Sequence, residues 1–164
     1  MAPKPSNMSD QQVRQIANDQ DAALARQLLS HAKVAALAVI DAEGSPFVAL
    51  TAPAIASNGA PLVLVSSLST HGKVLAAAGR VSMLFSGVED PTQPMKTPRL
   101  TIQGLAVEAP SSERSSYLSA QPNADLYIDF GDMQLYTIEV EIAHLVVGFG
   151  RAVSLSPEQL INKC

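Results

Sequence analysis

The chain has 164 residues, a length typical of one domain that buries an apolar core without needing a disulfide or a metal ion. Apolar residues make up 47% of the sequence and charged residues 16%, a composition that excludes a disordered chain. The net charge of −4 argues against a nucleic-acid-binding protein that relies on a basic surface, and the low charge favours self-association. There is one cysteine, Cys164, and the three histidines are too scattered to predict a metal site.

The predicted elements begin after residues 1–9, which we interpret as a flexible arm, and they form one domain over residues 10–164. Apolar residues recur every three or four positions over residues 10–30, which predicts a helix with Ser9 or Asp10 as its N-cap. Seven short segments that are apolar or alternate apolar with polar residues are predicted strands: 34–40, 47–56, 62–66, 80–86, 99–108, 134–142 and 145–153. Shorter helices are predicted at 74–78, closed by Gly79, at 111–120 and at 157–163.

The turns between these segments indicate the fold class. Residues 42–45 and the Asn58-Gly59 pair are typical of tight turns, which would join the first three strands into an antiparallel meander. Gly148 and Gly150 predict a bulge, or a close approach of the backbone to a ligand, within the last strand. We therefore expect a mainly β fold with short helices, arranged as a small antiparallel barrel rather than as a doubly wound parallel sheet.

The sequence favours a cytoplasmic protein without a membrane partner. No apolar run approaches the roughly 20 residues that a bilayer-spanning helix needs. Residues 1–9 lack the apolar core of a secretory signal.

Residues 66–73 are the strongest candidate site, because hydroxyl groups cluster there between a strand and a helix. Backbone N–H groups at the start of a helix favour an anion, and Ser66, Ser67, His71 and Lys73 could add donors and a charge for a phosphate monoester. Ordinary capping of the helix by a serine or threonine explains the same residues, so the segment by itself leaves both interpretations open.

Two arginines are the next candidates. Arg99 opens an apolar strand, where its guanidinium group could pair with a phosphate or a carboxylate, and Arg151 follows a pair of glycines. Taken singly, each is better explained as a surface arginine. A weaker candidate set consists of four carboxylates, Asp129, Asp132, Glu139 and Glu141, of which the last two match the solvent face of a strand.

Five segments that cover most of residues 35–153 resemble one family: 35–53, 61–75, 80–86, 98–104 and 130–152. They include Pro46-Phe47-Val48-Ala49-Leu50 and end in Gly-Phe-Gly-Arg-Ala. In this order they resemble the FMN-binding split-barrel proteins related to pyridoxamine 5′-phosphate oxidase, and most closely the branch named for haem utilisation. The resemblance implies a six-stranded antiparallel split β-barrel, working as a homodimer with two flavin sites at its interface. It also implies an FMN-binding flavoprotein, an FMN-dependent oxidoreductase whose small-molecule substrate the sequence does not identify.

The resemblance further implies which residues bind the cofactor. By analogy, the isoalloxazine ring is lined, largely through backbone groups, by Phe47, Ala49, Leu50 and Thr51. The ribityl phosphate is held by Ser66, Ser67, His71 and Lys73, where the residues alone already suggested an anion site. Arg99 and Arg151 match positions close to the flavin or the substrate. The resemblance implies no catalytic side chain, because the flavin itself carries the redox chemistry.

Three alternatives remain open. The chain could be a haem-binding or haem-degrading protein of the same fold, with His71, Arg99 and Arg151 supplying the ligand or the cations. It could be a non-catalytic flavin-binding dimeric module, because Gly72 and Val74 stand where the branch usually has a threonine and an asparagine. A deazaflavin could also take the place of FMN.

Overall fold

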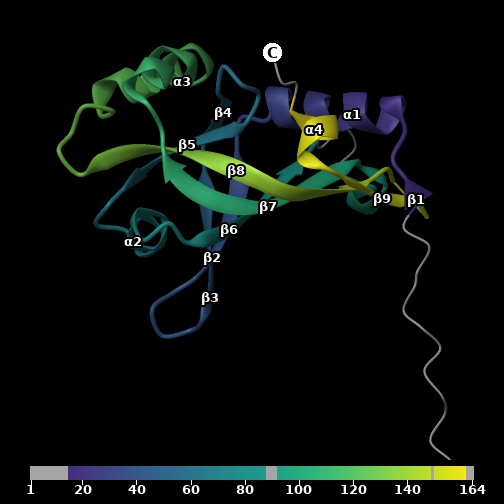
Figure 1. The fold of residues 1–164 in the computed structure, drawn as a ribbon, viewed down its shortest axis with the longest axis horizontal. Helices are drawn as coiled ribbons and strands as arrows, with labels where there is room; N and C mark the ends of the chain where they lie inside the picture. Colours follow the sequence, from purple (N-terminus) through teal and green to yellow (C-terminus); the bar gives the residue numbers. More distant parts are fainter. Residues whose placement is uncertain (1–14, 88–91, 149, 162–164) are drawn as a thin grey trace, which may run out of the picture.

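The structure, a computed structural model, describes residues 15–87, 92–148 and 150–161 (Figure 1). The predicted arm over residues 1–9 lies outside the described residues, as do the start of the first predicted helix, Phe149 and Cys164. The α-helices are α1 (Asp19–His31), α2 (Thr70–Ala76), α3 (Arg114–Ala120) and α4 (Pro157–Leu160). Turns of 3-10 helix lie at Pro94–Lys96, Ser111–Glu113 and Pro122–Leu126. None of the helices in the described ranges is long and apolar enough to cross a membrane.

The described residues contain nine strands in one sheet, and all of the ladders except β1 with β9 are antiparallel. The strands are β1 (Gln15–Ile16), β2 (Ala35–Ile40), β3 (Pro46–Thr51), β4 (Pro53–Ile55), β5 (Pro61–Ser66), β6 (Arg80–Ser86), β7 (Arg99–Glu108), β8 (Met133–Val146) and β9 (Ala152–Leu155). The predicted segments 80–86 and 99–108 therefore match β6 and β7.

A bend at Ala52 closes the sheet into a barrel. The predicted strand 47–56 is divided there, so that β3 pairs with β2 while β4 pairs with β5. Counted as one bent strand, β3 and β4 complete a ring of six neighbours in the order β2, β3–β4, β5, β8, β7 and β6. The predicted six-stranded antiparallel split barrel is confirmed, and Figure 1 shows its long strands β7 and β8 curving across the molecule.

Alternating side chains of the barrel strands form the main core. Met83 and Phe85 of β6 face Leu100 and Ile102 of β7, and all four are fully buried. A second, smaller core surrounds Tyr117 of α3, outside the barrel. Because every second residue of a strand faces one side of the sheet, the apolar pattern alone placed these strands correctly.

Helix α1 begins later than predicted. Its N-cap is Asn18, whose side chain accepts from the Asp21 N–H while the Asp21 carboxylate accepts from the Asn18 N–H, both at 2.9 Å. Ile16, which the periodicity placed in the helix, instead pairs with Ser154 as part of β1. The reciprocal cap sets the start of the helix at this point, and the residues before it pair in the sheet instead.

Helix α2 begins earlier than the predicted 74–78, because Ser69 caps it at Thr70. The residue that leaves the helix in a left-handed conformation is Ala78, with φ +52°, and not Gly79 as predicted. Gly79 is required for another reason: a Cβ there would lie 2.7 Å from the carbonyl oxygen of Val74.

The last predicted strand, 145–153, is wrong. Strand β8 continues to Val146, and a tight turn leads from it into β9, with the Val147 N–H donating to the Arg151 carbonyl. Gly148 and Gly150 lie in this turn with φ of +72° and +89°, so they serve a turn rather than a strand bulge. The irregularity in pairing lies instead at Gly104 of β7, where a Cβ would be 2.0 Å from the Glu139 carbonyl oxygen.

Candidate functional site

The Ser66 turn, residues 66–69, connects β5 to α2 and is held by its own hydroxyl groups. The Ser66 carbonyl accepts from the Ser69 N–H at 3.1 Å and from the Ser69 hydroxyl at 2.7 Å. The Ser69 hydroxyl also accepts from the Gly72 N–H at 3.0 Å. The Ser66 hydroxyl donates to Asp132 at 2.5 Å and accepts from the Leu68 N–H at 3.2 Å. The capping interpretation is thus confirmed for Ser69, and the Ser66 hydroxyl is already engaged.

Gly72 allows helix α2 to lie directly against this turn. A Cβ at Gly72 would be 2.0 Å from the Ser66 carbonyl oxygen and 2.9 Å from the Ser69 hydroxyl. Real side chains do not tolerate such contacts, so the close approach depends on glycine. The departure from threonine noted in the sequence therefore has a structural reason.

His71 and Phe47 form the central contact of the candidate site. Their rings are nearly parallel, with an interplanar angle of 12° and centroids 6.1 Å apart. The Nδ1 atom of His71 is buried without a hydrogen-bond partner, and its Nε2 atom lies 3.4 Å from the Ser69 hydroxyl. Burial lowers the pKa of the His71 imidazole, so the ring is uncharged at neutral pH. By contrast, Nδ1 of His31 and of His144 each lie within hydrogen-bond distance of an oxygen.

Lys73 lies on a different side of α2 from His71. It lines a cavity of about 500 Å³ together with Thr70 and with Asp41 and Glu43, two acidic residues of the turn between β2 and β3. Residues two positions apart on a helix do not face each other, which explains the separation. The predicted phosphate-binding cluster is therefore divided: His71 packs on Phe47, while Lys73 faces the β2–β3 turn.

The four predicted residues of β3 are divided between two faces of the strand. Phe47, Ala49 and Thr51 pair with buried residues of β2, and the Thr51 hydroxyl donates to the Ala35 carbonyl at 3.1 Å. Leu50 points outward and is 75% exposed. Among the described strands, β3 pairs only with β2, so its second edge keeps free backbone groups beside α2.

Arg99 lies far from the Ser66 turn. Ser66 pairs with the first residue of β8 and Arg99 pairs with the last, Val146. Measured along the strand, these two ends of β8 are about 40 Å apart at roughly 3.3 Å per residue. The Arg99 guanidinium donates to the Met95 carbonyl at 3.3 Å. One chain therefore does not bring all of the predicted cofactor-binding residues into one site.

Arg151 contacts helix α1. Its guanidinium donates to the carboxylate of buried Asp21 at 2.6 Å. This hydrogen bond, with a second from the Asn18 N–H, lowers the pKa of Asp21. Arg151 thus fixes the turn before β9 against the capped start of α1, a role that local sequence does not reveal because the partners are 130 positions apart.

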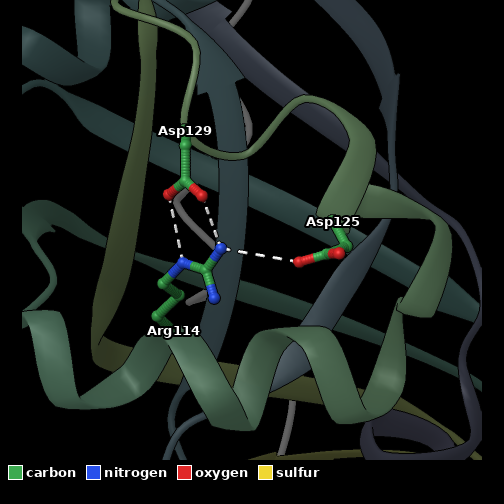
Figure 2. Close-up of polar contacts among 3 residues, drawn as sticks. All are labelled: Arg114, Asp125 and Asp129. Atoms are coloured by element: carbon green, nitrogen blue, oxygen red, sulfur yellow. Dashed lines mark hydrogen bonds and ion pairs between the residues drawn. The ribbon is translucent and has the colours of Figure 1, made fainter.

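The β7–β8 connection, residues 109–132, supplies contacts that the sequence reasoning missed. Figure 2 shows Arg114 of α3 held by Asp129 through two hydrogen bonds, at 3.1 and 2.6 Å, with Asp125 3.5 Å away. The buried Tyr117 hydroxyl donates to the Ala52 carbonyl at 2.8 Å, at the bend between β3 and β4. Burial raises the pKa of Tyr117 to about 12.

Glu113 anchors the same connection to the turn between β4 and β5. Its carboxylate accepts from the Ser57 N–H and from the Ser57 hydroxyl. Burial raises the pKa of Glu113, but hydrogen bonds from Ser57 and Ser116 outweigh it, so the pKa is lowered overall. Of the candidate carboxylates, Asp129 pairs with Arg114, Asp132 accepts from Ser66, and Glu141 pairs with Arg80. No group of three potential metal ligands gathers in the described residues.

Comparisons with known proteins identify the family. A profile of the family described as CREG, beta-barrel matches residues 17–162. The chain belongs to this family. It is 33% identical over 114 residues to the non-canonical heme oxygenase HOZ of Arabidopsis thaliana chloroplasts, covering 67% of this chain and 34% of that protein. It is 29% identical over 143 residues to the heme oxygenase HutZ of Vibrio cholerae, covering 79% of this chain and 78% of that protein.

Solved structures agree with this assignment. A heme binding protein from Mycobacterium smegmatis superposes with a TM-score of 0.81 at 28% identity, covering 88% of this chain and 61% of that one. A Clostridium acetobutylicum protein of the pyridoxinephosphate oxidase family has a TM-score of 0.66 at 11% identity, covering 88% of this chain and 99% of that one, which shows the fold alone. The chain spans about a third of the Arabidopsis relative's length and under two thirds of the Mycobacterium chain. The split-barrel fold is thus confirmed, and three of these four proteins have heme in their names.

Proposed function

We propose that this protein binds haem, and that His71 is the residue that approaches the iron. The names of three relatives support haem as the ligand. The observation that carries the proposal is the state of His71, whose ring is uncharged and whose Nε2 atom makes only a 3.4 Å contact with the Ser69 hydroxyl. A neutral imidazole is the form that coordinates metals, and the only ring contact of His71 to another polar side chain in the described residues is the long one to Ser69.

The surroundings of His71 fit a haem group better than they fit the phosphate of FMN. Phe47 offers an aromatic face beside the imidazole. By contrast, the hydroxyls of Ser66 and Ser69, which a phosphate would need, already hold the turn. Haem bound here would supply iron chemistry, while the chain's residues would bind and orient it.

The test is titration of the purified protein with haem, followed by the Soret band. We expect saturation at one haem per chain, and we expect His71→Ala to weaken binding by about tenfold or more, equal to about 1.4 kcal/mol. His31→Ala is the matched control, since His31 is exposed at the end of α1 and should bind like wild type. Equal affinity of the two variants would refute the role of His71, and absence of a Soret shift in wild type would refute haem binding.

We propose further that bound haem is a substrate, since both curated relatives are named as heme oxygenases. Addition of a reductant in air should then bleach the Soret band of the complex. A band that persists for hours under these conditions would reduce the function to binding alone.

FMN is the second candidate, and the free backbone edge of β3 favours it. Backbone groups on an unpaired edge can bond the polar rim of a flavin, as the resemblance implies for residues 47–51. In this reading the chain is an FMN-dependent oxidoreductase or a flavin-binding module, and a deazaflavin would occupy the same edge. Retention of FMN through desalting, with release on heating, would support it; a colourless protein after FMN addition would exclude it.

We propose that the protein works as a homodimer through the outer face of β2, β3 and β6. Leu50, Ala36 and Leu84 form one row across these strands, and Val48 lies on the same face as Leu50. Val48 and Leu50 are 63% and 75% exposed. A second copy would cover this apolar surface, and it could bring Arg99 or Arg151 toward the site from the partner.

A further inference from the structure

We propose that Asp132 is a positioning residue for the candidate site, acting through the Ser66 turn; this rests on the proposed function. Asp132 is the last residue before β8, 66 positions away from Ser66, and it makes two separate contacts with the turn. Its carboxylate accepts from the Ser66 hydroxyl at 2.5 Å, and its carbonyl oxygen accepts from the Ser67 N–H at 2.7 Å.

The contacts of Ser66 link the position of Asp132 to that of His71. The Ser66 carbonyl holds both the N–H and the hydroxyl of Ser69. Ser69 in turn caps α2 through the Gly72 N–H and lies 3.4 Å from Nε2 of His71. Gly72 contacts the same Ser66 carbonyl so closely that it leaves no room for a Cβ. A shift of the Ser66 turn would therefore move the first turn of α2, and His71 with it.

The segment that carries Asp132 is held in place by contacts of its own. The β7–β8 connection before it is fixed by the Arg114–Asp129 pair in Figure 2 and by the Tyr117 hydroxyl on the Ala52 carbonyl. The Met133 N–H donates to the Phe130 carbonyl at 2.9 Å, which closes the turn that presents Asp132. The connection thus contacts the chain at the end of β3 and at the Ser66 turn, the two segments that flank the candidate site.

The test compares Asp132→Ala with Asp132→Asn in haem titrations. The asparagine keeps an oxygen that accepts from Ser66, so we expect it to bind nearly like wild type, whereas the alanine variant should bind about tenfold more weakly, with a shifted Soret maximum. Asp125→Ala is the matched control, because it removes an exposed carboxylate from the same connection without touching the turn. Equal haem affinity of Asp132→Ala and wild type would overturn the proposal, as would an asparagine variant as weak as the alanine variant.

Two further measurements keep the result decisive. If Asp132→Ala does not fold, Ser66→Ala removes the same hydrogen bond from the other side, together with the one from the Leu68 N–H, and should weaken haem binding at least as much; unchanged affinity overturns the proposal. Hydrogen exchange of the Ser67, Leu68 and Ser69 amides in the ligand-free protein should accelerate in Asp132→Ala and not in Asp125→Ala. If wild type binds no haem, the proposed function fails, and unchanged exchange in Asp132→Ala would separately refute the positioning role.

Discussion

Replacing Gly72 by alanine tests whether the close approach of α2 to the Ser66 turn is real. The new Cβ would begin 2.0 Å from the Ser66 carbonyl oxygen, so that the helix must move back by about 1.5 Å to reach a contact of about 3.5 Å. Overpacking of this kind costs about 1–3 kcal/mol, and loss of the Ser69 cap costs about 1 kcal/mol more. The better helix propensity of alanine returns about 1 kcal/mol. We expect a net loss of about 2 kcal/mol.

Urea denaturation measures this loss directly, and a domain of this size should also lose about 4–8 °C in Tm. Gly131→Ala is the matched control, because a Cβ there meets nothing within 4 Å, and its free energy of unfolding should stay within about 0.5 kcal/mol of wild type. If Gly72→Ala proves as stable as Gly131→Ala, the contact between α2 and the Ser66 carbonyl is wrong. The haem affinity of Gly72→Ala should also fall, because His71 moves with the helix.

Three other predictions address the contacts around the site. Asp21→Asn should lower the free energy of unfolding by about 1–2 kcal/mol at neutral pH, since it breaks an ion pair whose arginine is 39% exposed. Because the folded-state pKa of Asp21 is lowered, the stability that its carboxylate contributes is lost as pH falls from about 5 to 3. The stability curves of the variant and of wild type against pH should therefore converge in that range. Tyr117→Phe should cost about 1–2 kcal/mol, because it removes the hydrogen bond to the Ala52 carbonyl, and it should remove one phenol ionisation near pH 12 from an ultraviolet titration. Burial raises the Tyr117 pKa above its unfolded value, so the stability that the neutral phenol contributes is lost as pH rises from about 10. Leu50→Glu should yield monomers in light scattering, whereas Leu126→Glu, equally exposed outside the proposed interface, should not; a dimeric Leu50→Glu variant would place the interface elsewhere.

The sequence pattern indicated only some of the contacts in the candidate site. Hydroxyl groups around residues 66–73 indicated a helix start, and Ser69 is the helix cap that such a pattern predicts. The same pattern did not show that Ser66 is engaged by Asp132, or that His71 and Lys73 face different ways. The resemblance led to the split barrel, while its FMN assignment stays a prediction beside the haem that the relatives' names support.

Local sequence patterns were enough to predict the strands whose two faces differ in polarity. In β6 and β7, buried and exposed residues alternate, and the bounds inferred from that period match the structure. Local chemistry likewise marked the turns at residues 42–45 and 57–60, where Gly44 and Gly59 adopt positive φ.

The contacts between distant groups, by contrast, follow from the closed barrel. Arg151 donates to Asp21, Tyr117 donates to the Ala52 carbonyl at the bend, and Asp132 accepts from Ser66. Each of these contacts joins residues more than 60 positions apart, and each is set by strand register and by the curl of the sheet. The periodicity of a strand shows which of its faces is apolar, but it does not show which other segment lies opposite. The residues that contact the site from distant segments are therefore known only from the closed barrel.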